Sequence, residues 1–260
     1  MNPFLPPFRS LHPALRAIIL LNAAVFALCA FERTLGLHLF ASLALFPRWA
    51  GDRPWTLLTY AFVHANFVHV ALNMLMLWSF GDDVARTLGG RRFVLFYLAA
   101  ALVAGCASVF FYQGSVVGAS GALLGVMYLN GALYPDRRML FFWLIPMRMG
   151  WGVWVVAALD LLATNTGDGV AHWAHLGGFA AGIVYARLFL RHRLRPSFLS
   201  RLAAKLRFRR GSGAEPIDLD ELLRKISERG IDSLTPGERA ALLAESERRR
   251  REKEEYQRWR

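Results

Sequence analysis

The chain has 260 residues, of which 55% are hydrophobic, and its mean hydropathy is +0.31. This composition is too apolar for an ordinary soluble domain, and the apolar residues lie in long blocks, which favours a membrane protein with several spans. Most of the net charge of +12 lies from Arg187 onward, where 20 Lys and Arg accompany 12 Asp and Glu. We interpret this excess as basic flanks of membrane spans and exclude nucleic acid as a partner.

Six segments are long and apolar enough to predict membrane-spanning helices, since a span needs roughly 20 such residues. They lie at about 13–31, 58–80, 93–112, 116–134, 150–164 and 170–190. The fifth is short and follows the apolar stretch 139–147, which leaves its start open. The first predicted span is followed by further spans and lacks a small-residue cleavage site. This pattern is not typical of a cleaved signal peptide. The sequence predicts an all-α membrane domain over residues 1–190.

Basic residues predict the orientation of these spans. Most lie before span 1, between spans 2 and 3, between spans 4 and 5, and after span 6, which places them on one side of the membrane. The positive-inside rule makes that side, with both termini, cytoplasmic. The loop near 32–57 departs from the rule with three arginines. Because no organelle transit peptide is visible, we expect a multi-pass protein of the bacterial cytoplasmic (inner) membrane.

Three segments outside the predicted spans differ from them in composition. The apolar loop from Glu32 to Trp55 predicts short helices lying in the outer interface. Residues 191–214 form a basic linker, and residues 215–260 form a charged tail with helix starts at Asp218, which fits a capping box, and at Thr235-Pro236. A solvated helical hairpin is favoured for this tail, and docking to a partner or to anionic lipid stays open.

A serine and a histidine inside the spans suggest a nucleophile and its base. Ser120 lies in Gly118-Ala119-Ser120-Gly121, about five residues into span 4, and His175 lies about six residues into span 6. With both spans running inward, the two side chains fall at one depth, roughly 8 Å below the outer edge of the hydrocarbon. Glycines and alanines flank both, and such small faces let membrane helices approach closely. Taken alone, the serine motif is a weak signal, because serine in a membrane helix often bonds to its own backbone.

Two polar residues of span 2 strengthen this interpretation. His69 and Asn73 are four residues apart, on one helix face. Attack by a serine on an amide generates an oxyanion, which preorganised hydrogen-bond donors stabilise. The Ser120 backbone N–H is a natural third donor.

Together, the His-x-x-x-Asn helix, the Gly-x-Ser-Gly helix and the Ala-His-x-x-Gly helix resemble the rhomboid family of intramembrane serine proteases, over roughly residues 10–190. The resemblance implies a six-helix bundle with a water-filled cavity. Ser120 would be the nucleophile, His175 the general base, and His69, Asn73 and the Ser120 amide the oxyanion site, with Gly118 allowing close backbone approach. It implies transmembrane protein substrates cleaved within the lipid bilayer near its outer face, substrate access beside spans 2 and 5, and no metal or cofactor.

The sequence departs from the family at two positions. Thr56 follows Trp55 where the family often has arginine, which bears on how the loop is anchored. Leu124 stands where many members have an aromatic that packs on the catalytic imidazole. Neither departure removes a reacting group.

The sequence also allows other interpretations. For Asp160 in span 5 a structural or gating use is favoured over a third catalytic role, with packing orienting the histidine. A metal site formed by His64, His69, His172 and His175 is disfavoured because no carboxylate accompanies them. A soluble α/β-hydrolase and a transporter fit less well. The main rival is a catalytically silent rhomboid-like protein that binds membrane helices without cutting them.

Overall fold

The computed structural model describes residues 6–31, 33–141, 145–164, 166, 169–190, 219–239, 242–243 and 245–246. The α-helices in this part are α1 (Pro13–Phe31), α2 (Arg33–Leu43), α3 (Thr56–Thr59), α4 (Phe67–Leu88), α5 (Gly90–Phe111), α6 (Ser120–Leu133), α7 (Met149–Ala163), α8 (His172–Phe189) and α10 (Leu219–Arg229). The 3-10 helices are η1 (Phe8–Ser10), η2 (Pro47–Trp49), η3 (Tyr60–Phe62) and η4 (Ile231–Ser233), and the strands are β1 (Arg138–Phe141) and β2 (Ile145–Arg148). The chain divides into two compact units, Met1–Ser197 and Phe198–Arg260.

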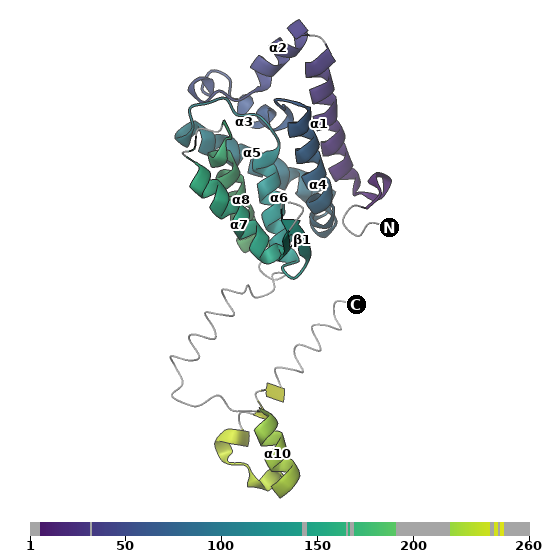
Figure 1. Cartoon of the computed structure of the whole chain (residues 1–260), viewed down its shortest axis with the longest axis vertical. Helices are drawn as coiled ribbons and strands as arrows, with labels where there is room; N and C mark the ends of the chain where they lie inside the picture. Colours follow the sequence, from purple (N-terminus) through teal and green to yellow (C-terminus); the bar gives the residue numbers. More distant parts are fainter. Residues whose placement is uncertain are drawn as a thin grey trace. The chain divides into compact units, whose positions relative to one another are not determined.

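Helix α6 forms the centre of the first unit (Figure 1). It contacts α4, α5, α7 and α8, and α8 packs in turn against α5 and α7. Residues 121–127 of α6 are all buried, including Leu124. A helix that is apolar on every face belongs in the interior of a bundle. The other helices therefore surround α6 and fix the position of its two ends.

The lengths of the helices suit a membrane protein. Among the described residues, α1 and α5 are long and apolar enough to cross a membrane, and Thr56–Phe62 with α4 makes a third candidate if this bent pair is one span. Helices α6 and α7 are apolar but shorter, with 14 and 15 residues. The mostly helical bundle agrees with the predicted class, and the count of six spans stays a prediction.

Helix α4 begins later than the predicted start at residue 58. The segment Thr56–Phe62 is helical but meets α4 at an angle of 92°, and Val63 between them is extended. Asn66 then caps α4, because its side chain accepts a hydrogen bond from the His69 N–H at 2.8 Å. An asparagine cap satisfies one of the unpaired donors of the first turn and sets the helix start.

The stretch 139–147 before the fifth predicted span lies largely in a short antiparallel hairpin. Strand β1 pairs with β2, with Arg138 opposite Arg148 and Leu140 opposite Pro146. The hairpin is a departure from the all-α prediction. Proline lacks the N–H that a helix interior requires, but it is accepted in a two-stranded hairpin, where an edge is free.

The loop after α1 contains the predicted short helices. These are α2 and η2, and Leu35 and Leu37 on α2 are exposed, as an interfacial helix requires. Three later side chains anchor the end of α2, where helix carbonyls lack partners within the helix. Arg53 Nη1, Trp55 Nε1 and Thr59 Oγ1 donate to the carbonyls of residues 41, 42 and 43 at 3.1, 2.9 and 2.8 Å.

Thr56, the first departure from the family pattern, supports the same loop. Its side chain is 2% exposed, and its hydroxyl donates to the Arg53 carbonyl at 2.6 Å. The arginine that the family often places at this position is therefore replaced by a buried hydrogen bond, while Arg53 itself makes the contact to α2.

The second unit contains α10 and η4 and a helical turn beginning at Pro236. The predicted start at Thr235 is confirmed as a capping box. The Thr235 N–H donates to Glu238 Oε2 at 2.8 Å, and the Glu238 N–H donates to Thr235 Oγ1 at 3.3 Å. The predicted linker 191–214 and the cap at Asp218 lie outside the described residues, and the predicted boundaries at 190 and 214 stay predictions.

Candidate active site

Ser120 is the first residue of α6, and two contacts hold the preceding segment outside the helix. Val116 pairs with Leu45 through backbone hydrogen bonds of 2.8 and 3.1 Å, and the Gly118 N–H donates to the Tyr60 carbonyl at 3.0 Å. Gly118 has φ +111°, a conformation that glycine adopts without strain. The Ser120 hydroxyl consequently lies at the positive end of the α6 dipole, where the first N–H groups lack partners within the helix.

His175 lies in the first turn of α8, and its ring reaches Ser120. The distance from His175 Nε2 to Ser120 Oγ is 2.7 Å; Ser120 is half-buried, and the His175 side chain is 16% exposed. An imidazole nitrogen at this distance can accept the hydroxyl proton and so act as a general base. The structure therefore brings together the two residues that the sequence singles out.

Glycines at the contact between α6 and α8 allow this approach. A Cβ atom on Gly178 would lie 1.8 Å from the Gly121 carbonyl oxygen, and one on Gly182 would lie 2.8 Å from that of Gly125. Two backbones can be this close only where both helices lack side chains. The predicted small-residue faces are thereby confirmed.

Ser120 is recessed within the bundle, although the predicted reason was wrong. It is the first residue of its helix and His175 the fourth, not the fifth and sixth, because both helices begin later than expected. The recess arises from α5. Gly121 lies level with Ala104, since a Cβ on the glycine would meet the Ala104 Cβ at 2.7 Å. Helix α5 continues from Ala104 to Phe111, about 10 Å further at 1.5 Å per residue.

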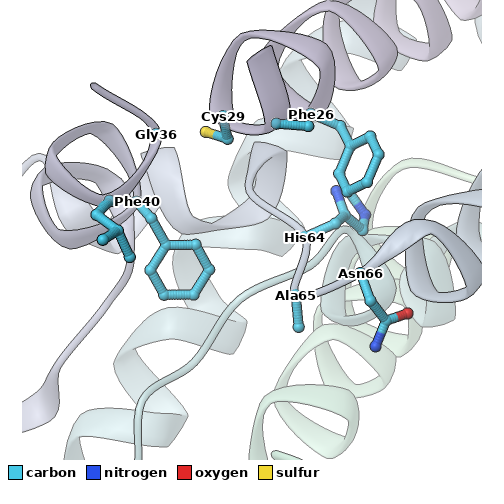
Figure 2. Close-up of a pocket in the computed structure, with 9 residues that line it drawn as sticks. Phe26, Cys29, Gly36, Phe40, His64, Ala65 and Asn66 are labelled. Carbon is cyan, nitrogen blue, oxygen red and sulfur yellow. The ribbon is translucent and has the colours of Figure 1, made fainter. Parts of the chain in front are cut away.

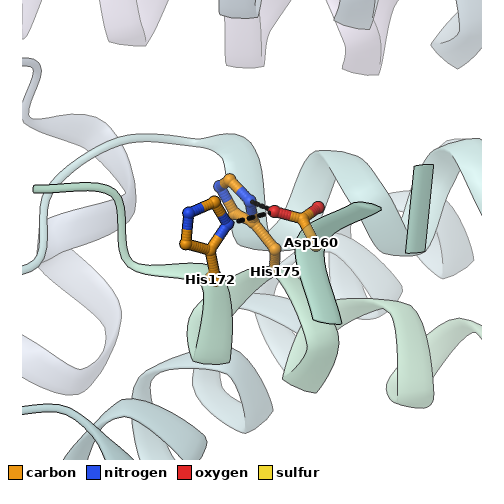
Figure 3. A group of neighbouring side chains, drawn as sticks. All are labelled: Asp160, His172 and His175. Atoms are coloured by element: carbon orange, nitrogen blue, oxygen red, sulfur yellow. Dashed lines mark hydrogen bonds and ion pairs between the residues drawn. The ribbon is translucent and has the colours of Figure 1, made fainter. Parts of the chain in front are cut away.

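Asp160 of α7 completes the cluster around His175 (Figure 3). Its Oδ1 atom lies 2.8 Å from His175 Nδ1 and 2.5 Å from Nδ1 of His172, so both rings converge on one carboxylate oxygen. The side chains of Asp160 and His172 are each about 90% buried. A carboxylate beside a catalytic imidazole is the arrangement that orients the base in serine proteases.

This contact corrects two sequence-based expectations. The imidazole of His175 was expected to be oriented by packing, and it is hydrogen-bonded to Asp160 instead. The metal site was disfavoured because no carboxylate accompanies the histidines, yet ligand atoms of Asp160, His172 and His175 lie within 4.8 Å of one another. The short segment that joins α7 to α8 could have indicated the contact between Asp160 and the histidines. It places the last turn of α7 beside the first turn of α8.

The three predicted oxyanion residues are placed differently from one another. The His69 ring lies against Gly118, where a Cβ would come within 2.7 Å of its Cε1 and Nε2 atoms. The Asn73 amide instead donates to the His69 carbonyl at 2.9 Å, within its own helix. Among the described residues Asn73 Oδ1 has no hydrogen-bond partner. The structure thus brings His69 against Gly118 in residues 116–119, which we call the serine loop because they lead to Ser120. The Asn73 amide donates one hydrogen bond within its own helix.

His64 contacts the same loop and was not predicted as a site residue. It is 3% exposed, its ring centroid lies 5.0 Å from that of His69, and the Ala119 N–H approaches its Nε2 atom at 3.4 Å. Its place five residues before His69, ahead of the Asn66 cap, could have indicated a residue that supports the serine loop.

A cavity of about 400 Å³ adjoins this region, between the end of α1, α2 and residues 64–66 (Figure 2). Its wall is mainly apolar, with Phe26, Leu37 and Phe40, and its polar lining comes from His64 and Asn66. Such a wall suits an aliphatic or aromatic group better than a charged one. His64 separates the cavity from the backbone leading to Ser120.

A bundle of apolar helices that holds a serine hydroxyl against an imidazole defines an integral membrane protein with a partly buried serine–histidine pair. Comparison with known proteins agrees. Residues 51–192 match the Rhomboid family, described as the rhomboid domain, and this range contains every site residue named above. The chain belongs to the rhomboid family.

Several named relatives are similar to this chain. The chain is 36% identical over 138 residues to Rhomboid protein 1, mitochondrial, of Saccharomyces cerevisiae, covering 48% of this chain and 39% of that protein. It is 32% identical over 178 residues to RHOMBOID-like protein 4 of Arabidopsis thaliana, covering 64% and 40%. It is 34% identical over 135 residues to Rhomboid protease GluP of Bacillus subtilis, covering 51% and 25%.

The chain therefore spans less than half the length of these three relatives. They come from a yeast, a plant and a bacterium, and the yeast protein is named mitochondrial. The comparisons support a membrane location but do not support the expected bacterial cytoplasmic membrane over the others.

Proposed function

We propose that this protein is a serine endopeptidase that cleaves transmembrane segments of other membrane proteins, with Ser120 as nucleophile and His175 as general base. The observation that carries the proposal is the 2.7 Å contact between Ser120 Oγ and His175 Nε2, made between two apolar helices of a rhomboid domain. One relative, from Bacillus subtilis, is named a protease.

The geometry supports a two-step acyl transfer. His175 Nε2 takes the hydroxyl proton as Ser120 Oγ attacks the peptide carbonyl, and the same nitrogen then returns the proton to the leaving amine. A water molecule repeats these steps on the acyl-enzyme and restores the free serine. The oxyanion forms beside the Ser120 N–H and His69, and such donors are each worth about 10²- to 10³-fold in rate.

The Asn73 amide carries two N–H groups, and one of them donates to the His69 carbonyl within α4. The second N–H is the one we assign to the oxyanion. We assign Asn73 a role in the substrate-bound state, where the developing negative charge offers a stronger acceptor than a helix carbonyl.

The recessed position of Ser120 within the bundle limits which peptide segments can reach it. A transmembrane helix satisfies its own backbone hydrogen bonds and so shields its amides, whereas cleavage needs an extended segment. We propose single-span substrates whose helix is weakened by Gly, Ala or Pro near the outer face. A substrate stiffened with leucines at that place should be cut more slowly, and equal rates would contradict this selection rule.

The decisive test is labelling with a fluorophosphonate probe in detergent, paired with cleavage of a single-span substrate in proteoliposomes. Ser120→Ala should lose both labelling and cleavage. Ser79→Ala is the matched control, because Ser79 is also a half-buried helix serine but bonds to its own backbone, with its hydroxyl 2.8 Å from the Leu75 carbonyl. Labelling that survives in Ser120→Ala would show that the nucleophile is another residue.

The second candidate is the catalytically silent protein that binds membrane helices. The observation that favours it is that the Asn73 amide donates to a carbonyl of its own helix. Under this alternative, wild type and Ser120→Ala bind a membrane helix equally well and neither cuts it. Binding retained with cleavage lost in Ser120→Ala supports the protease instead.

We also propose the domain organisation that the sequence predicts. Residues 1–190 form a six-span membrane domain, residues 191–214 a basic linker, and residues 215–260 a charged tail, with both termini cytoplasmic by the distribution of arginine. Cysteines introduced near each end and probed with a membrane-impermeant reagent test this orientation.

A further inference from the structure

The cluster at the end of α7 contains more than the serine–histidine pair requires. Asp160 approaches two imidazoles through a single oxygen, and the two rings stand nearly perpendicular, with an interplanar angle of 87° and centroids 5.9 Å apart. His172 and His175 are three residues apart on α8 and therefore share the face that meets α7. All three side chains are at least four-fifths buried.

The hydrogen-bond partners assign the protons of these rings. An ionised carboxylate only accepts hydrogen bonds, so each Nδ1 atom that approaches Asp160 Oδ1 carries a hydrogen. A neutral His175 ring with its hydrogen on Nδ1 has a lone pair on Nε2, and Nε2 is the atom that lies 2.7 Å from the Ser120 hydroxyl. This is the tautomer that a general base needs.

The second imidazole has a separate consequence. A carboxylate buried beside one neutral ring would keep much of its desolvation cost. His172 supplies a second donor to the same oxygen, at 2.5 Å, and so helps to keep Asp160 ionised and fixed in place within the bundle.

We propose that Asp160, held by His172, is a positioning residue that keeps His175 in the Nδ1–H tautomer and stabilises the imidazolium formed when Ser120 is deprotonated. Asp160 does not take the proton, which stays on His175 until the amine leaves. The site of this chain is then a Ser120–His175–Asp160 triad with His172 behind it. This inference rests on the proposed protease function.

The principal variant is Asp160→Asn, which keeps the shape of the side chain. Its amide group donates toward His175 and favours hydrogen on Nε2, which is the wrong tautomer. An equivalent exchange in a serine protease triad lowers kcat about 10⁴-fold. We expect Asp160→Asn to lower kcat by roughly 10²- to 10⁴-fold with KM nearly unchanged.

Asp82→Asn is the matched control. Asp82 is 9% exposed, as is Asp160, but it bonds the His12 N–H at 2.6 Å and Arg86 Nε at 2.8 Å, and these contacts do not involve the site. It should lower thermal stability in detergent and leave kcat unchanged. The comparison separates the effect of losing a buried carboxylate from the effect of losing the contact between Asp160 and His175.

His172→Gln tests the second donor. It removes the second donor to Asp160 Oδ1, so we expect kcat to fall with KM nearly unchanged. A wild-type kcat in a folded His172→Gln would show that Asp160 does not need this donor.

One measurement does not depend on whether any variant folds. Nitrogen-15 NMR of histidine-labelled wild type in detergent reports the tautomer of His175 at neutral pH. Hydrogen on Nδ1 supports the proposal, and hydrogen on Nε2 overturns it. A chelator arm is included because the same three groups could hold a metal. Activity lost on chelation and restored by Zn²⁺ would also overturn it.

The outcomes keep the two proposals apart. If wild type neither labels nor cleaves, the protease function fails. Suppose that wild type cleaves, Ser120→Ala does not, and a folded Asp160→Asn has wild-type kcat. The protease function is then supported, and the positioning role of Asp160 is refuted.

Discussion

The substitution Gly178→Ala tests whether the close contact between α6 and α8 holds Ser120 against His175. The added Cβ would lie 1.8 Å from the Gly121 carbonyl oxygen and 2.5 Å from its carbonyl carbon. Ordinary van der Waals contact begins at 3.4 Å, so the helices must separate by about 1.6 Å. Because the clash is with backbone, no side-chain rotation relieves it.

The separation has two measurable consequences. Overpacking of this kind typically costs about 1–3 kcal/mol of stability. It also draws His175 on α8 away from Ser120 on α6, and a misplacement of 1 Å in a catalytic group can cost about 10²-fold in rate. We expect a lower melting temperature in detergent and a fall of roughly 10²-fold in kcat for a single-span substrate in proteoliposomes.

Gly51→Ala is the control, because a Cβ there meets no atom within 4 Å and its backbone is unstrained. It should match wild type in both assays. If Gly178→Ala also matched wild type in both, the close approach of the two helices would not be what holds the serine against the histidine.

Other predictions concern the serine loop, the α4 cap and the tail. Gly118→Ala combines φ +111° with a contact of 2.7 Å to the His69 ring, so kcat should fall; an unchanged kcat would remove His69 from the site. Asn66→Ala removes the α4 cap and should cost about 1 kcal/mol, measured by thermal denaturation, and no change would contradict the capping role. The Lys225 ammonium and the Thr235 backbone and hydroxyl groups lower the pKa of Glu238 from 4.5 to about 2. The stability from this contact is therefore present above about pH 4.5 and lost as the pH falls through 2. Carbon-13 NMR of Glu238 should give a midpoint near 2 in the intact protein and a higher one in Lys225→Met; the same midpoint in both would contradict the pairing.

Much of the site could be predicted because it depends on residue type and spacing. Glycine next to serine, and glycine one turn after histidine, indicate helices that meet closely, and the structure places Gly121 against Gly178 as expected. The helix starts were predicted less well. They depend on the Asn66 cap and the left-handed Gly118 backbone, both of which lie within apolar runs that read as continuous helix.

Asp160 was underestimated for a different physical reason. The role of Asp160 depends on the rotation of α7 about its own axis, because this rotation decides whether the carboxylate faces α8 or the lipid. The hydrophobicity of α7 gives no clear answer, because the helix is apolar on most sides. Only the packed bundle shows that the carboxylate faces the two histidines.

The position of Ser120 about 10 Å short of the end of α5 bears on the supply of the second reactant. Hydrolysis consumes one water molecule for each bond broken, and hydrocarbon around the bundle holds almost none. In the proposed hydrolysis, each turnover therefore draws its water from the aqueous phase beyond the Phe111 end of α5, through the interior of the bundle. Under this proposal, the access of water to Ser120, as well as the strength of the nucleophile, limits how fast the acyl-enzyme is hydrolysed.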